Sequence, residues 1–116
     1  MTQVPTPIES EQWLQYFDKL AADSMTWFDF LTVIDRGESM DVVARVVNSE
    51  TGESALVITN VAENVSSLCT IYPGARWYER ESQEMFGVTF SGLTDSRPLL
   101  RQDDTHGTPM RKSVTL

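Results

Sequence analysis

The 116-residue sequence has one cysteine, one histidine and no apolar run near the length of a membrane span. Cys69, as the single cysteine, cannot form an internal disulfide or a thiolate cluster. We therefore expect the protein to be located in a reducing cytoplasm. His106 lies near Asp103 and Asp104, but that spacing is weak evidence for a metal site and favours a solvated loop. The N-terminus also lacks the basic and apolar regions of a signal peptide.

Basic residues are scarce, and their distribution along the chain is uneven. Residues 1–75 hold eleven acidic and three basic side chains, whereas residues 76–116 hold six of each. With a net charge of −8 and no basic stripe, the chain is not expected to bind nucleic acid. Five of the six basic residues in the last third are arginine, which is enriched at protein interfaces, although a solvated surface explains the same composition.

The apolar pattern predicts a single α+β domain over residues 1–116. Aromatic and leucine side chains recur at helical spacing within residues 9–22, with Ser10 as a plausible N-cap. Three short segments rich in β-branched and aromatic types follow, at residues 26–35, 40–48 and 54–59. The short turns between them favour antiparallel strands. We therefore expect two layers, with helices covering at least one face of a small, mostly antiparallel sheet.

The second half of the chain contains one clear element and a polar end. Residues 75–86 predict a helix that Gly87 ends in a left-handed conformation, whereas residues 60–75 show no clear pattern. Residues 93–116 contain two prolines and no apolar period. A segment of this composition buries little apolar surface by itself, so we expect an irregular tail that lies on this chain or on a partner.

The predicted second helix concentrates charge among aromatic residues. Arg80 can reach Glu84 four residues on, and Arg76 can reach Glu79, whereas Glu81 has no basic partner on the helix. The neighbours of Glu81 suggest that it is partly buried, and a buried carboxylate needs a donor. We expect the C-terminal segment or a partner chain to supply the positive charge.

Catalysis is a second interpretation of these carboxylates. Glu81 and Glu84 share a helix face, but no second acid pair, histidine pair or glycine-rich loop accompanies them. Cys69 has no adjacent base and is expected to be a small core residue. An interaction module therefore fits better than an enzyme that uses these glutamates and His106. A domain whose charged helix is merely a solvated face is the third interpretation.

Residues 75–92, ARWYERESQEMFGVTFSG, resemble the signature of the C subunit of NADH–quinone oxidoreductase, respiratory complex I. The family pattern is A-x-W-x-E-R-E-x-x-D-M/L-F/Y-G-I/V-x-F-x-G, and residues 107–112, GTPMRK, correspond to its later G-x-P-L-R-K. The resemblance covers roughly residues 10–112. Glu84 replaces the motif's aspartate, and Leu93 and Thr94 stand where the family has His-Pro.

The resemblance implies a non-catalytic accessory subunit that carries no cofactor or metal. Such a subunit lies in the peripheral arm, on the cytoplasmic face of the inner membrane, in a complex that couples NADH–quinone electron transfer to ion translocation. Its implied partners are the subunit related to the hydrogenase large subunit and the iron–sulfur subunits. Membrane-bound energy-converting nickel–iron hydrogenases and formate hydrogenlyases share this module and are the alternative. The implied contact residues are Trp77, Glu79, Arg80, Glu81, Glu84, Phe86, Arg97, Arg101, Arg111 and Lys112.

Overall fold

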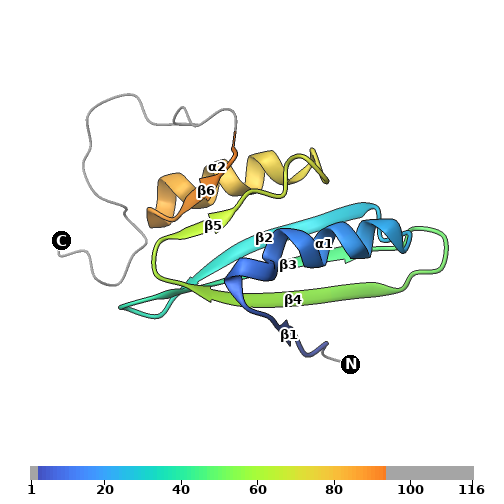
Figure 1. Cartoon of the computed structure of the whole chain (residues 1–116), viewed down its shortest axis with the longest axis horizontal. Coiled ribbons are helices and arrows are strands. Elements are labelled where there is room, and N and C mark those ends of the chain that lie inside the picture. Colours follow the sequence, from blue (N-terminus) through green and yellow to red (C-terminus); the bar gives the residue numbers. More distant parts are fainter. Residues whose placement is uncertain (1–2, 94–116) are drawn as a thin grey trace.

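The computed structural model describes residues 3–93, and its main element is a four-stranded sheet of order β1-β4-β3-β2 (Figure 1). Its strands are β1 (Thr6–Pro7), β2 (Trp27–Asp35), β3 (Met40–Val47) and β4 (Ser54–Val61). The β2–β3 and β3–β4 pairs are antiparallel, whereas β1 runs parallel to β4. The three longer strands confirm the predicted strands and their antiparallel pairing. Gly37 and Gly52 turn the chain between them with φ of 96° and 81°, which glycine adopts without a steric penalty.

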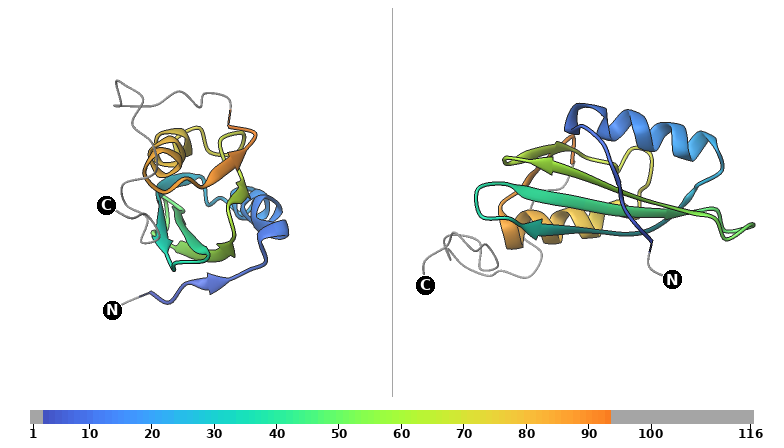
Figure 2. Two further views of the ribbon diagram at one scale, coloured as in Figure 1. Left: turned by 90° about the vertical axis from the view of Figure 1, so that its left-hand side faces the viewer. Right: turned by 90° about the horizontal axis from the view of Figure 1, so that it is seen from below.

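A short 3-10 helix, two α-helices and a small parallel sheet complete the described fold. They are η1 (Ser10–Gln12), α1 (Trp13–Ala22), β5 (Asn64–Ser66), α2 (Ala75–Phe86) and β6 (Thr89–Ser91). Seen along the strands, the short β5–β6 sheet lies between α1 and α2 (Figure 2). The predicted α+β class is confirmed, and so is the predicted helix over residues 75–86. The predicted irregular tail lies outside the described residues, apart from Leu93.

The core lies on the sheet face that carries Val42, Ala44 and Val46, each of which is fully buried. Trp13 and Phe17 of α1 pack into the same cluster, with ring centroids 4.8 Å apart in an edge-to-face arrangement. The prediction that helices cover at least one side of the sheet is therefore confirmed. On the opposite face Arg45 and Val47 are half-buried, and Arg45 forms an ion pair with Asp29.

The first helix begins later than predicted, and Ser10 is not its N-cap. Ile8 is held in an extended conformation because its N–H donates to Ile58 O over 3.0 Å and its carbonyl accepts a hydrogen bond from Thr59 Oγ1 over 2.8 Å. The chain then turns through η1, which precedes α1 and has no side-chain cap. This turn sets the phase of α1, so that Trp13 faces the core.

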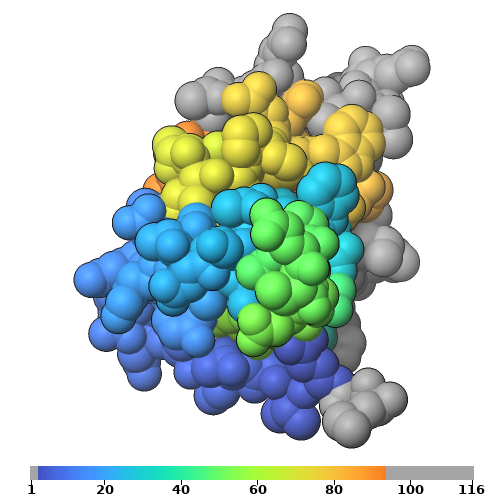
Figure 3. Space-filling view, turned by 90° about the vertical axis from the view of Figure 1, so that its right-hand side faces the viewer, coloured from blue at the N-terminus to red at the C-terminus, as the bar shows by residue number. Residues whose placement is uncertain are grey.

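The segment between β5 and α2 packs against the end of α1, as the yellow and light-blue surfaces in Figure 3 show. Tyr72 fixes this contact, because its hydroxyl donates over 2.7 Å to the carbonyl of Met25, shortly after α1 ends. Burial, with the charge of Asp18 as a second cause, raises the pKa of Tyr72 to about 12. No helix among residues 3–93 is long and apolar enough to cross a membrane.

Candidate interaction site on helix α2

Helix α2 has one buried face and one outward surface. Ala75, Glu79 and Ser82 are buried, whereas 52% of the Trp77 surface is exposed and Glu81 is exposed beside it. The helix ends at Gly87, whose φ of 78° confirms the predicted left-handed termination. The outward surface is therefore presented by a helix with a defined end.

Tyr78 attaches α2 to the edge strand of the main sheet. Its hydroxyl donates to the Asp29 carbonyl over 3.2 Å, and its ring lies 5.8 Å from that of Phe28. At the other end of the helix, the Phe90 N–H donates to Gln83 Oε1 over 3.2 Å. These contacts hold α2 against β2 and β6, so the position of its outward surface follows from the core.

Glu79 is the most deeply buried charged residue of α2, with 0% of its surface exposed. Its Oε1 accepts hydrogen bonds from Ser67 Oγ at 2.6 Å and from the Cys69 thiol at 3.2 Å. Its Oε2 accepts a hydrogen bond from the Leu68 N–H at 2.7 Å. One carboxylate thus joins α2 to the segment that follows β5, and its donors come from this chain.

The structure corrects three predictions: two about the glutamates of α2 and one about Cys69. Glu79 takes its donors from residues 67–69 rather than from Arg76, because it faces the core whereas Arg76 is exposed. Glu81 is exposed and not partly buried, because it is two residues from the buried Glu79 and therefore lies almost on the opposite side of the helix. Cys69 is half-buried and donates to a carboxylate, so it is more than a small core hydrophobe.

The shared burial of Glu79 and Cys69 alters how both groups titrate. Burial raises the pKa of Glu79, and the hydrogen bonds from Leu68, Ser67 and Cys69 reverse part of that shift. Burial likewise raises the pKa of the Cys69 thiol, and the nearby Glu79 charge raises it further. Because a thiolate is the reactive form of cysteine, this environment favours an inert thiol.

The raised pKa of Glu79 predicts how stability depends on pH. An unfolded glutamate titrates near 4.5, and the folded state holds the Glu79 proton more tightly. This contribution to stability is therefore fully present below about pH 4.5 and is lost as the pH rises through the folded pKa. Because Gln does not titrate, we expect Glu79→Gln to cost more unfolding free energy at about pH 4.5 than at about pH 8. Urea unfolding of both chains measures this, and an equal or larger cost at the higher pH contradicts it.

The other predicted contact residues are distributed between this surface and the undescribed end of the chain. Arg80 and Glu84 of α2 are half-buried. Phe86 is also half-buried and packs against the core. Four predicted contact residues lie outside the described residues: Arg97, Arg101, Arg111 and Lys112. His106, which one alternative interpretation used as a catalytic group, lies outside them too.

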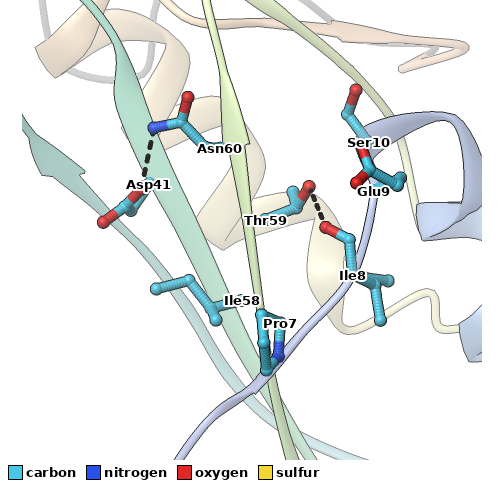
Figure 4. Close-up of a pocket in the computed structure, with 8 residues that line it drawn as sticks. All are labelled: Pro7, Ile8, Glu9, Ser10, Asp41, Ile58, Thr59 and Asn60. Carbon is cyan, nitrogen blue, oxygen red and sulfur yellow. Dashed lines mark hydrogen bonds between the residues drawn. The ribbon is translucent and has the colours of Figure 1, made fainter.

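A separate hollow of about 380 Å³ lies where β1 and η1 leave the edge of β4 (Figure 4). Some of its polar groups are paired within the chain: Thr59 Oγ1 donates to the Ile8 carbonyl, and Asn60 Nδ2 donates to Asp41 Oδ1 over 2.9 Å. Burial acts to raise the pKa of Asp41, but hydrogen bonds from Asn60 and Arg36 hold it below its usual value. Among residues 3–93, no group of three His, Cys, Asp or Glu side chains is placed to hold a metal ion. We assign no catalytic role to this hollow.

The fold and the α2 surface define a small α+β domain that presents an aromatic and charged helix. Residues 6–116 match the family described as respiratory-chain NADH dehydrogenase, 30 Kd subunit, and the chain belongs to this family. This confirms the resemblance stated from the sequence.

Related chains carry the same family name. The C subunit of the NADH-quinone oxidoreductase of Bartonella tribocorum is 39% identical over 79 residues, which is 66% of this chain and 39% of the relative. The same subunit of Rhodopseudomonas palustris is 31% identical over 99 residues, which is 77% of this chain and 48% of the relative. The chain thus spans less than half the length of these curated relatives.

Two solved structures share the fold. A trypsin-resistant fragment (1–134) of Nqo5 superposes with a TM-score of 0.64 at 18% identity, covering 77% of this chain and 79% of the fragment. A chain of the membrane-bound sulfane sulfur reductase, an archaeal respiratory membrane complex, superposes with a TM-score of 0.84 at 20% identity. That likeness covers 100% of this chain and 75% of the other.

Proposed function

We propose that this chain is a non-catalytic accessory subunit in the peripheral arm of a complex I-like membrane oxidoreductase. In this role it docks against the subunit related to the hydrogenase large subunit and near the iron–sulfur subunits, on the cytoplasmic face of the membrane. Membership of the 30 Kd subunit family supports this role. The observation that carries it is the outward surface of α2, where an exposed indole lies among charged side chains.

The composition of this surface favours docking over a solvated helix face. Trp77 exposes 52% of its surface, although tryptophan is a large apolar residue that gains from burial. Tryptophan and arginine are enriched among the residues that dominate binding energy at interfaces, and this helix presents Trp77 between Arg76 and Arg80. Charged neighbours contribute specificity for the partner more than affinity.

Glu79 has an indirect role in this proposal. Because its carboxylate is buried and holds the segment after β5, it orients α2 instead of contacting the partner itself. The remaining α2 residues of the proposed interface are Trp77, Arg80, Glu81, Glu84 and Phe86. The tail residues Arg97, Arg101, Arg111 and Lys112 extend the proposed contact along the chain.

A second candidate is the equivalent small subunit of a membrane-bound energy-converting nickel–iron hydrogenase or formate hydrogenlyase. The chain departs from the complex I pattern at two places, and such a diverged copy is compatible with this candidate too. Glu84 stands in the place of the motif's aspartate, and Leu93 and Thr94 stand in the place of His-Pro. Both candidates use the same docking surface, so they differ only in which subunits assemble with the chain.

Affinity capture of the tagged full chain from gently solubilised native membranes, with mass spectrometry of the captured proteins, tests the proposal. Flavin- and NADH-binding subunits are the expected result, and a nickel-site large subunit without them favours the hydrogenase candidate. Absence of oxidoreductase subunits contradicts both.

A matched pair of variants tests the surface. Trp77→Ala should lower the yield of partner subunits about 10-fold, the loss expected for an aromatic at the centre of an interface. Trp27→Ala is the control, because that residue is 62% exposed and belongs to β2 rather than α2. Equal yields from the two variants would show that docking does not depend on α2.

A further inference from the structure

Trp77 and Glu81 form an adjacent pair on the outward surface of α2. They are four residues apart, a spacing that places helical side chains next to each other with about 5–6 Å between Cβ atoms. Both are exposed, whereas Glu79 on the same helix is fully buried. The pair therefore offers an exposed indole and a carboxylate to whatever lies against the helix.

Glu81 has no basic partner in the described part of the chain. The residues three and four positions away from it are Trp77, Tyr78, Glu84 and Met85, and none of these is a cation. No ion pair among residues 3–93 involves Glu81. By contrast, Asp29 is paired with Arg45 of β3, and Asp41 is paired with Arg36 of the β2–β3 turn. The exposed carboxylate lies beside an exposed aromatic ring, so the two side chains are accessible to a cation from outside residues 3–93.

We propose that Trp77 and Glu81 together bind one arginine side chain of a neighbouring subunit. The guanidinium stacks on the indole of Trp77 and forms hydrogen bonds with the carboxylate of Glu81. This inference deepens the proposed function and rests on it.

The chemistry of the pair favours arginine over lysine. A guanidinium is planar, so it can stack on an indole and still direct its N–H groups at a carboxylate, whereas an ammonium group acts as a compact point charge. Arginine–carboxylate contacts can also be bidentate, which fixes the orientation of the partner. The charge that is complementary to this occupant is the carboxylate of Glu81, which is exposed.

The test begins by locating the partner residue. The full chain carries a photoreactive benzoylphenylalanine in place of Trp77, which keeps an aromatic ring at that position, and is assembled in cells that lack the native chain. Irradiation followed by mass spectrometry identifies the cross-linked peptide. The expected peptide belongs to another subunit and contains an arginine. A peptide without arginine, no cross-link, or a cross-link to residues 94–116 of this chain overturns the inference.

A double-mutant cycle then measures the pair. Glu81→Gln, and separately replacement of the located arginine by glutamine, should each lower the yield of captured complex about 10-fold, and the two together should cost no more than either alone. Glu38→Gln is the control, because Glu38 is an exposed acid in the β2–β3 turn, far along the chain from α2, and should leave the yield unchanged. Losses that add, or a Glu81→Gln yield equal to the wild type, overturn the inference.

The two levels of the proposal fail in different ways. If the wild-type chain captures oxidoreductase subunits but Glu81→Gln captures them equally well, the arginine site is wrong and the accessory-subunit role stands. If the wild-type chain captures no oxidoreductase subunits, both are wrong.

Discussion

Replacing Glu79 by alanine should lower the free energy of unfolding by about 3–5 kcal/mol. The substitution removes the acceptor of the Leu68 N–H and of the Ser67 hydroxyl, and both donors are buried. A buried donor left without a partner costs about 1–3 kcal/mol, and the space vacated by the side chain adds to this loss. The link between α2 and the segment after β5 would be broken at the same time.

Urea unfolding at neutral pH measures this effect, with Glu81→Ala as the matched control. Both substitutions remove a glutamate from the same helix, but Glu81 is exposed, so its loss should change stability by less than about 0.5 kcal/mol. If the two variants are equally stable, Glu79 does not have the structural role assigned to it. A loss of partner capture by Glu81→Ala without a loss of stability would separate the two functions within one motif.

Replacing Phe17 by alanine should cost about 3–5 kcal/mol. Phe17 is fully buried between α1 and the sheet, and its ring lies 4.8 Å from that of Trp13 and 6.2 Å from that of Tyr72. The surrounding rings belong to different elements and cannot all move into the space that the substitution leaves. Because close packing is lost on several sides, the loss of unfolding free energy should be among the larger ones for a large-to-small substitution in a core.

The control for Phe17→Ala is Leu14→Ala on the same helix. Leu14 is 37% exposed, so its truncation removes less buried apolar surface and should cost under about 1 kcal/mol. Thermal or urea unfolding of the two variants and the wild type measures the difference. Equal losses would mean that α1 packs on the sheet through a different face from the one described.

The sequence alone predicted the elements whose signals are local. Helix α2 was predicted with the observed bounds, because a break at Pro73 and Gly74 precedes it and Gly87 ends it. The strands β2, β3 and β4 follow from runs of β-branched and aromatic residues separated by short turns. The pattern of the 75–92 segment also identified the family, because a long motif with fixed spacing is specific even when the rest of the chain has diverged.

The sequence did not predict β1 and β5, which are two and three residues long. Elements this short contain no measurable period, and they exist because distant segments meet in parallel, as Asn64 meets Thr89 and Thr6 meets Val57. The late start of α1 has the same origin, since the pairing of Ile8 with β4 determines where the chain can turn. Pairing between distant segments therefore determined the short strands and the start of α1, which the local sequence pattern did not predict.

The roles of the glutamates show most clearly what could not be predicted from the sequence. Charge, spacing and motif determined that Glu79, Glu81 and Glu84 lie on one helix in a domain of the 30 Kd subunit family. Only the tertiary structure decided which of them is buried, because that depends on the rotation of α2 about its axis against the sheet. Tyr78 and Ala75 set that rotation through contacts with the core, and it turns Glu79 inward to three donors and Glu81 outward beside Trp77.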